Sequence, residues 1–293
     1  MSYREYLLSP EPRITQFRED TPLSARIFGV PYDYTSTYRP GSRFGPDAIR
    51  EAFMNIEIFS PRLGVDLEKA NIDDLGNLHH TSSLEKMCDG VGKLVNELVV
   101  DDDSTIAILG GEHSLTYGSF KSMPASTALI VFDAHLDMRD EFADLKLSHA
   151  TFLRRLTEEV GFDRVVHVGA RAASADEWSF VDKAKMKLIP MHTILTTEKP
   201  ENILKEFLRD FQEVYVSIDM DAIDPAFAPA VGNPEPGGLT THGILEFLYA
   251  LTGKFLRGFD IVEMTPGYDN GATKTLAARL LAELIAISTL RKK

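Results

Sequence analysis

Short apolar runs alternate with amphipathic segments along most of the chain. The apolar runs have the length of buried strands, and we expect strands at residues 26–31, 72–76, 105–109, 128–132, 164–169, 187–190, 214–218 and 258–264. Apolar residues recur at helical spacing elsewhere, and we expect helices at residues 46–55, 84–100, 202–211, 243–251 and 273–290, with shorter ones starting near residues 115 and 151. Strands that alternate with helices predict an α/β fold with a parallel sheet covered on both faces.

The pattern contains neither an internal repeat nor a linker, so we expect a single domain over residues 1–293. Residues 1–24 mix Pro, Arg and Glu without periodicity, and we expect them to form an irregular N-terminal arm. Residues 32–46 are dense in Gly, Pro, Ser, Thr and Tyr. A loop of this length inside a compact domain is usually functional or forms an interface, and we expect one of these roles here.

Composition and charge narrow the classes of partner. Lys and Arg number 31 and Asp and Glu number 44, which gives a formal charge of −13. This charge argues against nucleic acid and anionic membrane surfaces, and it is compatible with a small cationic substrate. The single cysteine, Cys88, excludes an intrachain disulfide, so we expect a reducing cytoplasm. The N-terminal sequence has no apolar segment typical of a secretory signal, and no apolar run approaches the length of a membrane span.

Ligand-type side chains follow three of the expected strands. Asp133, His135 and Asp137 come directly after the run 128–132, at alternating positions that point to the same side of an extended chain. His113 follows the strand at 105–109, and Asp219 and Asp221 follow the strand at 214–218. Because open α/β sheets place their sites at the carboxyl ends of strands, we expect these side chains to converge.

This ligand set predicts a metal site. Four carboxylates and two imidazoles are more than one divalent ion usually needs, whereas two ions that share a carboxylate would use them all. Oxygen-rich ligands with two imidazoles favour Mn²⁺, with Zn²⁺, Co²⁺ or Fe²⁺ as alternatives, and the absence of cysteine from the set disfavours structural zinc. We therefore expect two Mn²⁺ per chain.

Three motifs in this order resemble the signatures of the ureohydrolase family, which contains arginases and agmatinases. They are Gly-Gly-Glu-His-Ser at 110–114, Asp-Ala-His-Leu-Asp at 133–137 and Ser-Ile-Asp-Met-Asp-Ala-Ile-Asp-Pro at 217–225. Further similarity at residues 29–31, 39–46 and 263–266 extends the resemblance over most of the chain. Residues 39–46, 148–151 and 224–238 are more similar to agmatinases than to arginases.

The resemblance implies a three-layer α/β/α fold, a binuclear manganese centre, release of urea, and assembly into trimers or hexamers. Carried over by position, it assigns His113 and Asp137 to one ion, His135 and Asp221 to the other, and Asp133 and Asp219 to both. His149 would be the mobile acid or base, and Glu263 would pair with the substrate guanidinium.

The proposed chemistry suits these groups. Two metal ions lower the pKa of a shared water, and a carboxylate such as Glu263 can clamp a guanidinium through paired charged hydrogen bonds. Asp137 could pass a proton to the departing amine, and His149 could exchange protons with solvent because the ordinary pKa of histidine suits that task.

Substrate identity is less constrained by the sequence. Arg139 could attract a carboxylate, whereas Asp140 or Glu141 could hold a distal ammonium, and the excess of acids favours agmatine, which would give putrescine and urea. Residues 230–236 depart from the Gly-Thr-Gly-Thr-Pro of many family members, so guanidinobutyrate, arginine or another guanidino or formimino compound remain alternatives. A non-catalytic metal- or polyamine-binding protein is disfavoured because the ligand set is complete.

Overall fold

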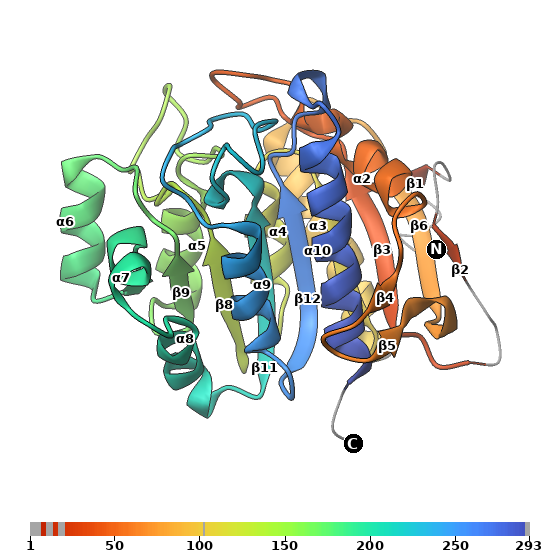
Figure 1. Ribbon diagram of the computed structural model, residues 1–293. Coiled ribbons are helices and arrows are strands. Elements are labelled where there is room, and N and C mark those ends of the chain that lie inside the picture. Colours follow the sequence, from red (N-terminus) through yellow and green to blue (C-terminus); the bar gives the residue numbers. More distant parts are fainter. Residues whose placement is uncertain (1–6, 10–13, 17–20, 102, 291–293) are drawn as a thin grey trace.

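The computed structural model describes residues 7–9, 14–16, 21–101 and 103–290, and its centre is a single large sheet (Figure 1). Within these residues the sheet has ten strands, ordered β1-β6-β3-β7-β12-β11-β8-β9-β10, with β2 paired to β6. The strands are β1 (Leu8–Ser9), β2 (Thr15–Gln16), β3 (Ala25–Val30), β6 (Ile72–Leu78), β7 (Thr105–Gly110), β8 (Thr127–Phe132), β9 (Val165–Val168), β10 (Lys187–Ile189), β11 (Glu213–Asp219) and β12 (Phe255–Val262). Every pairing from β6 to β10 is parallel, and only β1 and β2 run antiparallel to β6 within the described chain.

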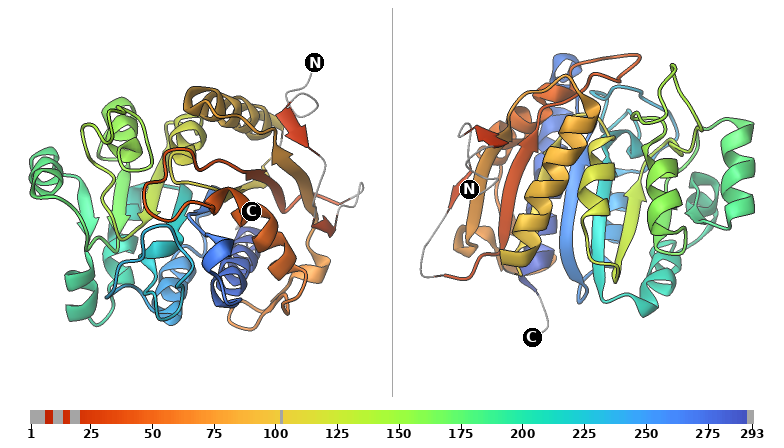
Figure 2. Two further views of the ribbon diagram at one scale, coloured as in Figure 1. Left: turned by 90° about the horizontal axis from the view of Figure 1, so that it is seen from above. Right: turned by 180° about the vertical axis from the view of Figure 1, so that it is seen from behind.

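Helices cover both faces of the sheet, as the two further views make clear (Figure 2). One face carries α2 (Gly45–Phe53), α7 (Met191–Thr196), α8 (Glu201–Phe207), α9 (Thr241–Tyr249) and α10 (Ala272–Thr289). The other face carries α3 (Leu84–Asp101), α4 (Leu115–Lys121), α5 (Phe152–Val160) and α6 (Ala175–Ala184). The expected three-layer α/β/α fold with a mostly parallel central sheet is therefore confirmed.

The apolar runs are continuous because the central strands are buried on both sides. In β8, Ala128, Ile130 and Phe132 pack into the core beneath α9 and α10. The alternate residues Leu129 and Val131 pack into the core beneath α4 and α5. A strand between two helical layers thus has no polar face, which explains why alternation is absent from these runs.

Some elements differ from the sequence-based expectation. Helix α6, helix α7 and the hairpin of β4 (Phe59–Ser60) and β5 (Val65–Asp66) were not expected. Helix α6 had a readable signal, because the side chain of Ser174 accepts from the backbone of Glu177 while Glu177 accepts from the backbone of Ser174. This capping box is a known sequence signature of a helix start.

The N-terminal segment is more regular than an irregular arm where the structure describes it. Its residues 7–9 and 14–16 contain β1 and β2, which pair with β6. Residues 21–24 contain neither helix nor strand, as expected, and residues 1–6, 10–13 and 17–20 lie outside the described residues. Across the described chain, the search for a helix both long and apolar enough to span a membrane finds none.

The strand order brings four site-bearing strands together. Strands β7 and β8 are consecutive in the chain, yet β12 and β11 lie between them in the sheet. The order therefore reverses at this point, and parallel sheets place ligand sites in the crevice beyond such a reversal. The loops that leave β7, β12, β11 and β8 meet at the upper edge of the sheet as drawn in Figure 1.

Candidate metal centre and substrate cavity

The first group of candidate ligands surrounds His113. Its Nδ1 lies 3.0 Å from Asp133 Oδ2, 3.3 Å from Asp219 Oδ2 and 3.6 Å from Asp137 Oδ2. All four side chains are buried. One imidazole nitrogen therefore faces three carboxylate oxygens, two from the loop after β8 and one from the last residue of β11.

The second group surrounds His135, which is partly exposed. Its Nδ1 lies 3.0 Å from Asp221 Oδ2 and 3.6 Å from Asp133 Oδ1. The donor atoms of Asp133, His135 and Asp221 lie close enough together to hold an ion, as do those of His113, Asp133 and Asp137. Asp133 belongs to both groups and faces each with a different oxygen.

Hydrogen bonds behind His113 determine which of its nitrogens can bind a cation. Asp260 accepts hydrogen bonds from Ser217, Thr116 and Tyr215. Ser217 gives its only hydroxyl proton to Asp260, so its oxygen must accept from Nε2–H of His113, 2.8 Å away. The neutral ring then has its lone pair on Nδ1, among the three carboxylates. Such support behind a histidine ligand is typical of metal sites.

The cluster suits a cation better than a proton. Nδ1 of His113 is buried and makes no hydrogen bond of normal geometry within the described part of the chain. Burial lowers the pKa of His113, but the carboxylates of Asp133 and Asp219 outweigh burial and raise that pKa well above its usual range. For His135, Asp221 and Asp133 likewise outweigh burial and raise the pKa. A divalent ion between the same groups would take the place of these protons.

The carboxylates themselves are crowded. Burial and the charge of Asp133 raise the pKa of Asp137 well above its usual range, and burial and Asp221 do the same for Asp219. Burial alone would also raise the pKa of Asp133, but its contacts with His113 and His135 hold that pKa well below its usual range. Without added positive charge, the cluster cannot keep all its carboxylates ionised.

Glu263 follows β12 and lies beside the cluster. Its Oε1 accepts a hydrogen bond of 2.9 Å from the backbone N–H of His113. A Cβ on Gly232 would lie 3.2 Å from Oε2, a tight contact, so the loop 224–238 approaches the carboxylate closely at this glycine. Burial, together with the charge of Glu112, raises the pKa of Glu263 to about 8. A cationic ligand would stabilise the ionised form.

His149 lies in the loop before α5. The edge of its ring meets Phe142, with ring centres 5.7 Å apart, and its Nδ1 lies 3.1 Å from Thr35 Oγ1. Burial, and then the positive charges of His135 and His113, lower the pKa of His149 to about 4. The ring is therefore neutral at neutral pH and can accept a proton.

These groups line one cavity of about 460 Å³. Its lining includes His113, Asp137, Asp219 and Glu263, which we call the inner end, and, outside the ligand cluster, Arg139, Phe142, Ser174 and Glu177, which we call the outer wall. Arg139 Nε lies 3.7 Å from Glu177 Oε2, and Glu177 is itself buried. The outer wall thus carries one base and one acid.

The structure places Asp140 and Glu141 differently from Arg139. Neither is among the described residues that line this cavity. Both are exposed, and Lys146 lies 2.8 Å from Asp140 and 3.3 Å from Glu141. Asp140 also accepts a hydrogen bond from Arg155. The suggested substrate contacts of these two acids stay a prediction, to which the lining of this cavity adds no support.

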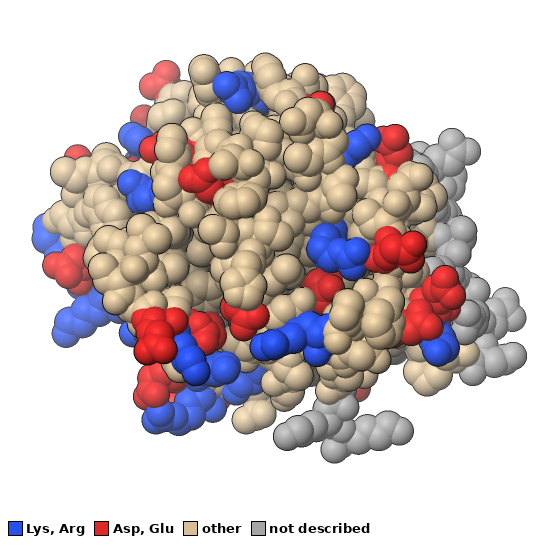
Figure 3. Space-filling model, viewed as in Figure 1, with Lys and Arg blue, Asp and Glu red and all other residues tan. Residues whose placement is uncertain are grey.

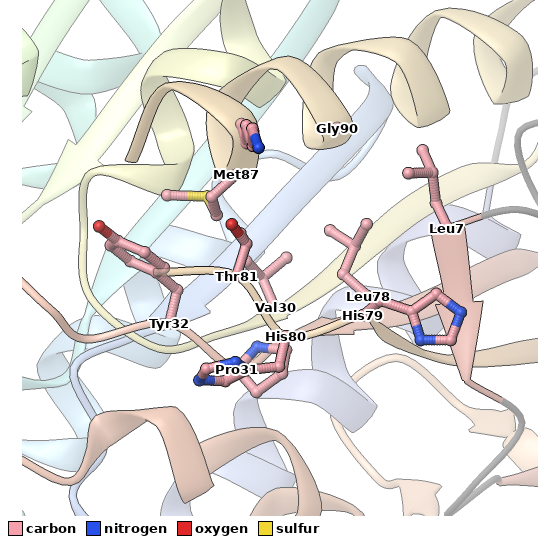
Figure 4. A pocket seen from close by; sticks show the side chains of 11 residues that line it. Leu7, Val30, Pro31, Tyr32, Leu78, His79, His80, Thr81, Met87 and Gly90 are labelled. Atoms are coloured by element: carbon pink, nitrogen blue, oxygen red, sulfur yellow. The ribbon is translucent and has the colours of Figure 1, made fainter. Parts of the chain in front are cut away.

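A second cavity, of about 340 Å³, lies between β6, β3 and α3 (Figure 4). Its labelled side chains include Tyr32, His79, His80 and Met87 around an apolar floor. No carboxylate is among its described lining residues, in contrast to the cavity at the sheet edge. Of these two cavities, the one at the sheet edge has the donor set of a divalent cation site.

Sequence reasoning missed several residues that support the site. They are Thr35, Glu112, Ser217, Asp260 and Glu177. Glu112 and Ser217 lie inside motifs that were recognised, but neither is a candidate metal ligand, so ligand spacing gave no reason to select them. Glu177 could have been found from the Ser174–Glu177 capping signature of the missed helix.

The fold and the site together define a class: a parallel α/β protein with carboxylates and imidazoles gathered at the carboxyl edge of its sheet. Comparisons with known proteins lead to the same class of protein. A model of the arginase family matches residues 23–286. An agmatinase of Bacillus cereus is 34% identical over 268 residues, 88% of this chain and 90% of that protein. An N(1)-aminopropylagmatine ureohydrolase of Thermococcus kodakarensis is 34% identical over 284 residues, 94% of this chain and 96% of that protein.

The solved structures give the same result. The crystal structure of the agmatine ureohydrolase of Thermoplasma volcanium matches with a TM-score of 0.85 at 38% identity, covering 91% of this chain and 90% of that chain. The chain belongs to the arginase family and is a ureohydrolase enzyme. The resemblance read from its three motifs is confirmed.

Proposed function

We propose that this chain holds two divalent ions, preferentially Mn²⁺, and hydrolyses agmatine to putrescine and urea. The observation that supports two ions is the position of Asp133, whose two oxygens face two separate groups of ligands. His113 and Asp137 would complete one site, and His135 and Asp221 would complete the other. Asp219, whose Oδ2 lies 3.3 Å from His113 Nδ1, is assigned to both ions by the family resemblance.

The charge of the candidate ligands also supports two ions per chain. Asp133, Asp137, Asp219 and Asp221 carry four negative charges when ionised, and two divalent ions supply four positive charges. A single ion would leave a large excess of buried negative charge, which is costly in a protein interior. Glu263 would then remain as a further carboxylate at the cavity beside the cluster, and the protonated guanidinium of the substrate carries the opposite charge.

When bound, two divalent cations activate water for attack near neutral pH. The chain's own residues would do the rest. One oxygen of Glu263 is held by the backbone of His113, so its other oxygen is available to orient the guanidinium. Asp137, at the inner end of the cavity, would carry a proton to the departing amine, and the neutral ring of His149 would exchange protons with solvent.

The outer wall of the cavity bears on the choice of substrate. Agmatine ends in an ammonium, and Glu177 is a buried acid on this wall. A longer polyamine with the same guanidino end, such as N(1)-aminopropylagmatine, is a second candidate, because a relative is named as a ureohydrolase of that compound. Arg139 keeps 4-guanidinobutyrate and arginine as further alternatives, since it would attract their carboxylates.

The test is urea release by the purified, Mn²⁺-loaded protein with agmatine, N(1)-aminopropylagmatine, 4-guanidinobutyrate and L-arginine side by side. Turnover that is highest with agmatine supports the proposal. A preference for N(1)-aminopropylagmatine would keep the mechanism and change the substrate. Preference for either carboxylate-bearing compound would contradict the assignment of Glu177. Absence of urea with all four would contradict the proposed reaction.

We further infer that the chain forms trimers or hexamers and works in the cytoplasm. The family resemblance supports assembly, as do the exposed aromatic side chains of Tyr38 and Phe44 in the loop 32–46. The area above α9 in Figure 3 also carries few charged side chains. The lone cysteine, Cys88, is free and buried, which suits a reducing compartment. Light scattering coupled to gel filtration tests the assembly, and a monomer would contradict it.

A further inference from the structure

We propose that Thr35, held by Glu112, is a positioning residue that fixes the orientation and the tautomer of His149. This inference rests on the proposed function, because it assigns His149 its proton-transfer role. Thr35 lies in the loop 32–46, and Glu112 lies in the turn after β7. Neither residue is among the candidate metal ligands.

Glu112 fixes Thr35 in both position and hydrogen-bond direction. Its Oε2 accepts from the backbone N–H of Thr35 at 2.7 Å, and its Oε1 accepts from Thr35 Oγ1 at 2.6 Å. Oε1 also accepts from Ser114 Oγ at 2.6 Å. Both oxygens are therefore occupied by donors, and the hydroxyl proton of Thr35 points at Glu112.

The loop has little freedom to move away from this arrangement. Glu112 donates its backbone N–H to the carbonyl of Tyr32 at 2.7 Å, and Gly111 donates to the carbonyl of Val30 at 2.9 Å. A Cβ on Gly111 would lie 2.0 Å from that carbonyl oxygen of Tyr32, so the two segments approach this closely only because residue 111 is glycine. The turn after β7 and the loop 32–46 therefore act as one rigid unit behind His149.

With its proton committed to Glu112, Thr35 Oγ1 can only accept from His149. It accepts from the backbone N–H of His149 at 3.0 Å and faces Nδ1 of the ring at 3.1 Å. Nδ1 must therefore carry the proton of the neutral ring, and Nε2 must carry the lone pair. Among the described residues, no hydrogen-bond donor contacts Nε2.

This assignment has a direct consequence for the reaction. A histidine acts as a base through one specific nitrogen, and the hydrogen bond at the other nitrogen determines which one it is. Thr35 makes Nε2 the basic atom and fixes the ring against Phe142, on the wall of the substrate cavity. Glu112 determines the tautomer of His149 without contacting it.

The test compares Thr35→Val, which has nearly the same shape and lacks the hydroxyl, with Thr35→Ser, which retains the hydroxyl. Thr35→Val should lower kcat by about 10- to 100-fold, a fraction of the usual contribution of acid–base catalysis, with KM and bound metal unchanged. Thr35→Ser should restore most of kcat. Ser36→Ala, which removes a neighbouring hydroxyl from the same loop, serves as the matched control and should leave kcat unchanged.

A double-mutant cycle separates positioning from a general loop effect. In a His149→Asn background, Thr35→Val should have no further effect on kcat, because the group on which it acts is gone. An equal loss of kcat in both backgrounds would overturn the proposal. A change in KM or metal content with kcat intact would also overturn it.

A structural measurement tests the proposal separately from activity. Nitrogen-15 chemical shifts of His149 in the zinc-loaded, diamagnetic protein report which ring nitrogen is protonated. Protonated Nδ1 in the wild type, lost in Thr35→Val, is the expected result even if none of the tested substrates turns over. Protonated Nε2 in the wild type would overturn the proposal. Failure of urea release alone would contradict only the proposed function.

Discussion

Binding of Mn²⁺ should raise the free energy of unfolding of the chain. The size of this rise should depend on Asp133, the ligand that we propose both ions share. A ligand present at about 100 times its Kd stabilises the native state by about 2.7 kcal/mol per site. With an unfolding entropy of about 2.1 cal/mol/K per residue, the 293 residues give about 0.6 kcal/mol/K. Each ion should therefore raise Tm by about 4 °C, and two ions by about 9 °C.

Two isosteric substitutions separate a shared ligand from an unshared one. Asp133 belongs to both ligand groups, whereas Asp221 belongs to the group around His135. In each variant the remaining amide oxygen can still accept the local backbone hydrogen bond, from His135 in one case and from Ala134 in the other. Asp133→Asn should abolish most of the Mn²⁺-dependent rise in Tm, whereas Asp221→Asn should keep about half of it.

The assay is differential scanning fluorimetry of each protein after removal of metal with EDTA and after titration with Mn²⁺, with bound metal counted by atomic emission. Activity should be lost in Asp133→Asn, whose fold without metal should remain intact. Two bound ions and a full rise in Tm in Asp133→Asn would refute the two-ion reasoning. Equal behaviour of the two variants would show that Asp133 is not shared.

Three further predictions concern the other groups of the site. Glu263→Gln should lower kcat/KM while leaving metal content unchanged; a collapse of metal content would mean that Glu263 supports the ions instead. Because burial lowers the pKa of His149 from 6.5 to about 4, the unfolded chain binds a proton in this interval that the folded chain does not. The free energy of unfolding should therefore fall by about 3 kcal/mol as the pH drops from 6.5 to 4. Urea unfolding of His149→Gln over the same pH range should show a fall that is smaller by this amount. Glu177→Gln can keep the cap of α6 and should raise KM for agmatine by about 10-fold or more, while an unchanged KM would remove Glu177 from the substrate site.

The sheet and the convergence of its loops were predictable from the sequence, because strands that are buried on both faces are continuous apolar runs. The runs at 128–132 and 214–218 correspond to β8 and β11 within two residues at each end. Acidic residues directly after such runs lie at the carboxyl ends of the strands, where parallel sheets place their sites. The clustering of His113 with Asp133 and Asp219 followed from that placement.

The residues of the outer wall of the cavity were harder to predict from the sequence. Asp140 and Glu141 follow the central motif, and proximity in sequence suggested proximity to substrate. Lys146 and Arg155 hold Asp140 at the surface instead, and only the folded chain reveals these pairings. The buried acid on this wall, Glu177, comes from a helix whose capping signature was overlooked.

The backbone at Asp137 and Glu263 differs from what the sequence suggested. The sequence analysis expected Asp133, His135 and Asp137 to alternate along an extended chain. β8 ends at Phe132, and Asp137 has a φ of 51°, in the left-handed region that a non-glycine residue adopts at an energetic cost. Glu263 has a φ of 63° directly after β12. Its N–H donates to Gly111 and its carboxylate accepts from His113, so the surrounding structure holds it in this conformation. A continuing strand would carry the chain past the cluster, whereas a left-handed residue turns it sharply. Strain at Asp137 and Glu263, the residues assigned to proton transfer and guanidinium binding, is therefore better explained by function than by stability.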